Sequence, residues 1–218
     1  TGTKWSWDAY FTAMKRFNQE TAYELDKWDI NKTNRPQLLG PCYELFRKWC
    51  YEMDGGLDPR TIKSCEKVNK ILLKGYKNKE QAWRNKMRYR AITWSCPPHY
   101  YANFSNWLAN CWGINIVLNM DSTMGHNMIS TTDPDQALMD LALFSEKGVM
   151  RHMAVGGWDN VNAVWEWASK FNCDMVIFND NVACKGMNGV HALMEEQARE
   201  LGFHFIFVEH DLEDCRTV

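Results

Sequence analysis

The sequence predicts an α/β fold, a doubly wound parallel sheet of about four strands that follows an N-terminal helical segment. Two observations lead to this prediction. From residue 90 onward, short apolar runs alternate with stretches of helical length, which is typical of a parallel sheet with helices on both faces. Before residue 90, apolar residues recur at helical spacing. We therefore expect a helical segment at residues 1–89 and an α/β domain at residues 90–218.

The helical segment is divided by two predicted breaks. Apolar residues between Trp5 and Phe17 share one helical face, and a loop is expected at residues 29–36. A second helix is predicted at residues 37–53, where a glycine pair ends it. A third helix is expected to begin at Pro59, with Asp58 as its N-cap, and to continue toward residue 88.

The α/β domain is predicted to hold four strands in the order 2-1-3-4, as in flavodoxin-like or Rossmann-like sheets. The strands are expected at residues 90–94, 114–118, 175–178 and 203–208. The helices between and beside them are expected at residues 99–112, 134–147, 158–171 and 190–201. Each crossover should be right-handed.

Composition excludes some classes of partner. The chain has 218 residues, with 25 basic and 27 acidic side chains and a net charge of −2. This balance argues against a nucleic-acid or membrane-surface partner, and no apolar run approaches the ~20 residues of a membrane span. Its 11 Trp and 12 Met residues fit either an aromatic core or an apolar ligand pocket and subunit interface.

The cysteines show no zinc-ribbon or thioredoxin-like spacing. None of the eight is separated from another by two residues, and no export-signal pattern is present, so we expect free thiols rather than disulfides. Cys50, Cys111 and Cys173 lie beside apolar residues, and each is expected to be a buried, unreactive thiol.

Two loops at the predicted carboxyl ends of strands carry the candidate chemistry, because ligands of such sheets bind at those ends. In the long loop at residues 179–189, Cys184 lies before a helix start and beside Lys185, which favours its thiolate. Gly186 allows close backbone approach. The alternative is a helix-capping loop with an incidental cysteine.

The second loop, Ser95-Cys96-Pro97-Pro98-His99, is a proline-stiffened turn, either at the ligand face or simply rigid. His126 lies in a long glycine-containing loop and is either a surface residue or a site residue.

These motifs resemble one family. The strand, the single-cysteine loop that ends at Gly189, the helix that ends at Gly202 and the strand that runs into Glu209-His210-Asp211 are followed by Asp214-Cys215-Arg216. Residues 30–218 thereby resemble the C-terminal half of the 2-hydroxyacyl-CoA dehydratase and benzoyl-CoA reductase family. The Cys-Lys-Gly at residues 184–186 is more similar to the benzoyl-CoA reductase branch.

The resemblance implies a [4Fe–4S] cluster held by three cysteines, one of which matches Cys184. The other ligands are expected in sequence before Thr1, or Cys96 or Cys42 takes their place. Lys185 and Gly186 would adjoin the cluster.

It also implies radical chemistry on a CoA thioester, with aromatic-ring reduction narrowly preferred over dehydration of a 2-hydroxyacyl group. Implied partners are a related second subunit and an ATP-hydrolysing activator iron–sulfur protein, in the cytoplasm. The alternatives are a ligand-binding module without a cluster and an electron-transfer paralogue without CoA chemistry. The residues expected to contact substrate are Trp94, Ser95, His99, Tyr100 and His126.

Overall fold

The computed structural model describes residues 2, 4–37, 58–82, 86–95, 104–119, 127–146, 158–183, 188–211 and 216. Its strands form one four-stranded sheet in the order β2-β1-β3-β4, and every pair is parallel. The α/β fold class and the strand order are therefore confirmed. The strands are β1 (Tyr89–Trp94), β2 (Ile114–Asn119), β3 (Met175–Asn181) and β4 (His204–His210).

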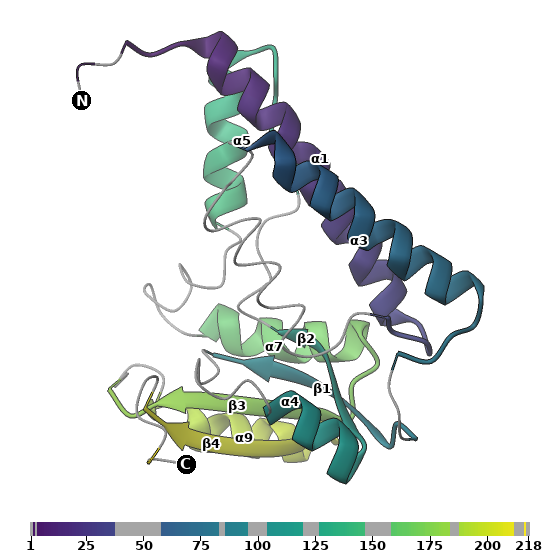
Figure 1. Cartoon of the computed structure of the whole chain (residues 1–218). Helices are drawn as coiled ribbons and strands as arrows, with labels where there is room; N and C mark the ends of the chain where they lie inside the picture. Colours follow the sequence, from purple (N-terminus) through teal and green to yellow (C-terminus); the bar gives the residue numbers. More distant parts are fainter. Residues whose placement is uncertain are drawn as a thin grey trace.

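Helices cover both faces of this sheet, as the doubly wound prediction requires (Figure 1). One face packs against α7 (Trp158–Lys170) and α9 (His191–Leu201). The other packs against the short α4 (Phe104–Trp107) and the π-helical turn η2 (Leu108–Trp112). Each face of the sheet is therefore apolar along most of its length.

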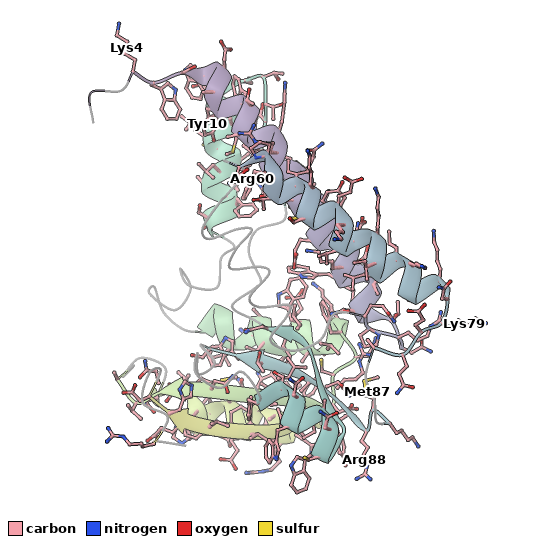
Figure 2. The ribbon with its side chains drawn as sticks, in the orientation of Figure 1. Lys4, Tyr10, Arg60, Lys79, Met87 and Arg88 are labelled. Atoms are coloured by element: carbon pink, nitrogen blue, oxygen red, sulfur yellow. The ribbon has the colours of Figure 1, made fainter. Side chains whose placement is uncertain are left out.

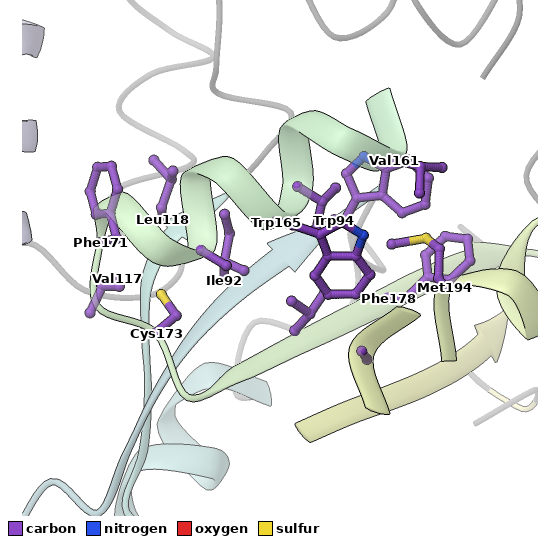
Figure 3. Close-up of a cluster of buried hydrophobic side chains, with 14 of the residues drawn as sticks. Ile92, Trp94, Val117, Leu118, Val161, Trp165, Phe171, Cys173, Phe178 and Met194 are labelled. Atoms are coloured by element: carbon purple, nitrogen blue, oxygen red, sulfur yellow. The ribbon is translucent and has the colours of Figure 1, made fainter. Parts of the chain in front are cut away.

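The larger core cluster lies between the sheet and helices α7 and α9 (Figure 3). The Trp94 and Phe178 rings lie with their centroids 4.7 Å apart, and the Trp165 ring stacks on Phe203 at 5.7 Å. Much of the tryptophan content thus serves the core, where large aromatic side chains contribute most apolar burial.

Two long helices, α1 (Trp7–Lys32) and α3 (Pro59–Lys77), lie side by side and extend away from the sheet (Figure 1). Helix α5 (Pro134–Glu146) packs on α1 through Phe17 and Phe144, whose ring centroids are 5.0 Å apart. Figure 2 places Tyr10 near the start of α1 and Arg60 in the first turn of α3.

The ends of these helices differ from prediction in two places. Asp58 caps α3 as expected, since its side chain accepts from the Arg60 N–H. However, α3 ends at Lys77 rather than near residue 88, because Lys79 adopts a left-handed conformation with φ 58°. Helix α1 continues to Lys32, through the first part of the predicted loop at 29–36.

The C-terminal end of α1 is tied to the sheet by buried polar groups. Asn31 donates its side-chain amide to the Val117 carbonyl of β2. The guanidinium of Arg90, at the start of β1, donates to the carbonyls of Asn31 and Thr33 and to that of Phe171, after α7. These bonds fix where the helical segment leaves the sheet.

The other helices agree with prediction where they are described. The predicted helix at 99–112 is present from Phe104, but its second half is π-helical, and it ends at Gly113 with φ 70°. Asp133 caps α5, since its carboxylate accepts from the N–H groups of Asp135 and Gln136. The predicted helix at 37–53 lies almost wholly outside the described residues.

Candidate functional site

The carboxyl ends of the four strands meet at one edge of the sheet, because all four are parallel. This edge is polar, in contrast to the apolar middle of the sheet. Buried polar side chains lie at it on every strand: Thr93 on β1 with Ser95 directly after it, Asn119 on β2, Asn179 and Asp180 on β3, and His210 on β4.

The end of β3 is the most unusual part of this edge. Asn179 and Asp180 are both 0 % exposed, and neither side chain has a hydrogen-bond partner among the described residues. Orphaned buried polar atoms are rare in folded proteins and call for an explanation. The end of β3 therefore buries two polar side chains whose hydrogen bonding the described residues do not satisfy.

Electrostatics at Asp180 favours its neutral form. Burial raises the pKa of Asp180, and the carboxylate of Glu209, directly opposite on β4, raises it further. His191 and His210 act in the opposite direction and lower it. Desolvation is the largest contribution, so the carboxyl group retains its proton to higher pH than an exposed aspartate does.

The loop after β3 is closed on Asn181. The Ala183 N–H donates to Oδ1 of Asn181 at 3.0 Å, and the Asn188 side chain donates to the Asn181 carbonyl at 3.4 Å. The Val182 N–H donates to the His210 carbonyl of β4 at 3.0 Å. The loop therefore begins and ends at the same residue of the carboxyl edge.

Four residues predicted from the sequence to form the site lie outside the described residues, although the segments that hold them are flanked in the chain by described residues. Cys184, Lys185 and Gly186 fall between Ala183 and Asn188, inside the loop that Asn181 closes, and Cys96 directly follows Ser95. His99, Tyr100 and His126 are also outside the described residues, as is Cys42. The assignment of all these residues to a site stays a prediction.

Two predicted substrate contacts are described. Trp94 is 1 % exposed, and its indole packs in the core near Trp165 and Phe178 (Figure 3). Ser95 is buried and has a φ of 64°, a left-handed conformation that is strained for a residue with a Cβ. The chain turns sharply here, immediately before Cys96.

The described cysteines lie away from this edge. Cys173 is buried just before β3, at the opposite edge of the sheet, and burial raises the pKa of its thiol to about 12. Cys65 is buried within α3, as an unreactive thiol would be. Cys111 is exposed on η2, so the prediction that it is buried was wrong. No group of three metal-binding side chains forms within the described ranges.

Sequence reasoning missed Asn179 and Asp180 as site residues because it ended the third strand at residue 178 and read both as loop. In the structure, β3 continues to Asn181, paired in register with Val208, Glu209 and His210 of β4. The polar sequence Asn-Asp-Asn is typical of a loop, so it gave no sign of this pairing. That β3 extends as far as β4 can be seen only from the register of the two paired strands.

Comparison with protein families gives one match. Residues 1–217 match the model of the 2-hydroxyglutaryl-CoA dehydratase, D-component, while the comparison with curated proteins finds no match. None of the described helices is long and apolar enough to cross a membrane. Because the match covers almost the whole chain, this protein belongs to the 2-hydroxyglutaryl-CoA dehydratase D-component family, whose description is that of one component of an enzyme acting on a CoA thioester.

Proposed function

We propose that this chain is an iron–sulfur subunit that acts by radical chemistry on a 2-hydroxyacyl-CoA thioester. The observation that supports this most is the loop closed on Asn181, at the carboxyl edge of the sheet. Cys184 is the cysteine within that loop. A loop fixed at both ends presents a ligand with little loss of conformational freedom.

Three of the eight cysteines lie among the described residues, and none of these three is at the carboxyl edge. Iron–sulfur clusters are bound by cysteine thiolates. Cys65 is buried in helix packing and Cys173 in the core, and Cys111 is exposed on η2. The sulfur ligand that we assign is Cys184, supported by its place after β3 and by the family that its motif resembles. The remaining ligands would be Cys96, Cys42 or residues outside the given sequence.

A bound cluster would supply a low-potential electron to the thioester. The chain's own residues do the rest. The aromatic core that includes Trp94 and Phe178 lies next to the carboxyl edge, and its tight packing keeps water out of that side of the site. Asp180 places a buried carboxyl group beside this core, and burial raises its pKa. Lys185 and Gly186 would lie next to the cluster. Lys185 would add a positive charge near it, and Gly186 would let the backbone come close to it.

The test is anaerobic purification followed by iron analysis. We expect brown protein with about four iron atoms per cluster. Cys184→Ala should lose iron and turnover of the thioester together and still fold. Cys173→Ala is the matched control, and it should keep its iron and lose only about 1 kcal/mol of stability. Full iron content in Cys184→Ala would refute the assignment.

Aromatic-ring reduction is the second candidate, supported by the Cys-Lys-Gly sequence at residues 184–186. The family match favours dehydration. The two are separated by assaying the holoprotein, with activator, ATP and reductant, on a 2-hydroxyacyl-CoA and on benzoyl-CoA. Turnover of only the aromatic ester would reverse our preference.

The proposal includes a related second subunit, an ATP-hydrolysing activator and a cytoplasmic location. Exposed tryptophans support a subunit interface, since Trp107 and Trp112 are 46 % and 55 % exposed and lie together beside η2. Large exposed apolar groups that cluster commonly mark a protein contact. Light scattering of the purified protein should give the mass of a dimer, and a monomer would refute this part.

A further inference from the structure

A row of buried polar side chains crosses the sheet on the face that packs against α4 and η2. Strand alternation and register place four side chains on this face near the carboxyl edge, where they follow its apolar cluster. Each is at most 4 % exposed. From one side of the sheet to the other they are Asn119, Thr93, Asn179 and His210.

Asn179 is the member of this row that the fold itself does not explain. Its side chain follows Ile177 on the same face and is 0 % exposed. Neither its Nδ2 nor its Oδ1 has a hydrogen-bond partner among the described residues. A buried polar group without a partner costs about 1–3 kcal/mol, so an apolar side chain here would make a more stable sheet.

A second asparagine shows that an orphaned amide alone does not indicate a ligand. Asn115, in the first half of β2, is 2 % exposed and also lacks a partner for either amide atom among the described residues. Asn115 lies near the amino edge, whereas Asn179 lies two residues before Asn181, which closes the candidate loop. Ligands of such sheets bind at the carboxyl edge, so only Asn179 is placed to meet one.

We propose that Asn179 is a specificity-determining residue that hydrogen-bonds the 2-hydroxyl and the thioester carbonyl of the acyl group; this inference rests on the proposed function. A 2-hydroxyacyl thioester carries a hydroxyl donor and a carbonyl acceptor on neighbouring carbons. The carboxamide of Asn179 carries the complementary pair, an Nδ2–H donor and an Oδ1 acceptor. Two parallel hydrogen bonds satisfy both orphaned atoms at once.

This pairing predicts which substrates are rejected. A site built to hydrogen-bond a hydroxyl discriminates strongly against the analogue that lacks it, because its own buried polar atom is then left unpaired. An acyl-CoA without the 2-hydroxyl group would leave Oδ1 of Asn179 without a partner again. On the β1 and β2 side of Asn179, Thr93 and Asn119 carry no formal charge, which suits an uncharged hydroxyl and carbonyl; His210, on the β4 side, is the titratable member of the row.

The first measurement is stability without ligand, on the anaerobically purified holoprotein. Asn179→Leu removes the amide and retains a side chain branched at Cγ, and it should raise the melting temperature. Asn115→Leu is the matched control and should also raise it. Asn179→Ala and Asn115→Ala remove the amides without adding volume. They control for the case in which leucine destabilises the protein by overpacking.

The second measurement is binding of 2-hydroxyglutaryl-CoA and of glutaryl-CoA, which lacks the hydroxyl, by calorimetry. The wild type and both Asn115 variants should prefer the hydroxylated thioester by about tenfold or more. Both Asn179 variants should bind the two thioesters within about twofold of each other, because the hydrogen bond that discriminates them is gone.

Each other outcome counts against the proposal. If both Asn179 variants melted below the wild type and also below the matching Asn115 variants, the amide of Asn179 would have a structural partner. Unchanged discrimination in Asn179→Leu and Asn179→Ala would overturn the inference and leave the proposed function intact. A wild type that binds both thioesters equally would do the same. A wild type that binds neither would overturn the proposed function, and the inference with it.

Discussion

Replacing Arg90 should separate the helical segment from the sheet. Its guanidinium is buried, and it donates to three main-chain carbonyls at 2.6–3.1 Å, those of Asn31, Thr33 and Phe171. These carbonyls lie at the C-terminal ends of α1 and α7. A positive charge at two helix C-termini also interacts favourably with both helix dipoles.

The magnitude follows from these contacts. A hydrogen bond to a charged group contributes about 1.5–3 kcal/mol, and each buried acceptor left without a partner adds its own cost. Some of the three carbonyls would regain water in the variant, so the terms do not simply add. We expect Arg90→Met to lose about 3–5 kcal/mol, a large part of the 5–15 kcal/mol that typically stabilises a folded domain.

Urea unfolding followed by circular dichroism measures this loss. With an m value of about 2 kcal/mol/M, the midpoint of Arg90→Met should fall by roughly 1.5–2.5 M. Arg88→Ala is the control, since Arg88 lies two residues away and is exposed (Figure 2), and it should change stability by no more than about 0.5 kcal/mol. A loss below about 1 kcal/mol in Arg90→Met would refute the reasoning.

Three further predictions concern single residues. Because burial raises the native pKa of Asp180, the charged form costs stability at neutral pH; Asp180→Asn should therefore stabilise the protein at pH 7. That gain should vanish as the pH falls to the ordinary aspartate pKa of about 3.9, and a gain independent of pH in urea titrations would contradict this. Gly113→Ala should lose about 1–2 kcal/mol or more in thermal melts, because φ is 70° and the new Cβ would lie 2.9 Å from the Lys86 carbonyl oxygen; an unchanged melting temperature would argue otherwise. Iodoacetamide should label Cys111 well before Cys65 and Cys173, as read by mass spectrometry, since only Cys111 of these three is exposed; early labelling of Cys173 would show that its burial is wrong.

The local sequence was sufficient for the kinds and order of the elements. Alternating apolar runs predicted the four strands, and loop residues such as Asp133 and Gly113 predicted a helix start and a helix end that the structure confirms. These signals are local, because capping bonds and left-handed turns involve neighbouring residues only. The position of Cys184 after the third strand, and the family that its motif resembles, were also legible in the sequence.

Tertiary structure decided where elements end and which polar groups become buried. Helix α1 continues to Lys32 because Arg90 and Asn172, far along the chain, donate hydrogen bonds to the carbonyls at its C-terminal end. Strand β3 extends over Asn179 and Asp180 because β4 pairs with it there, although both residues favour loops. Strand pairing and burial depend on contacts between distant segments, so the sequence alone showed the cysteine loop but not the orphaned amide of Asn179.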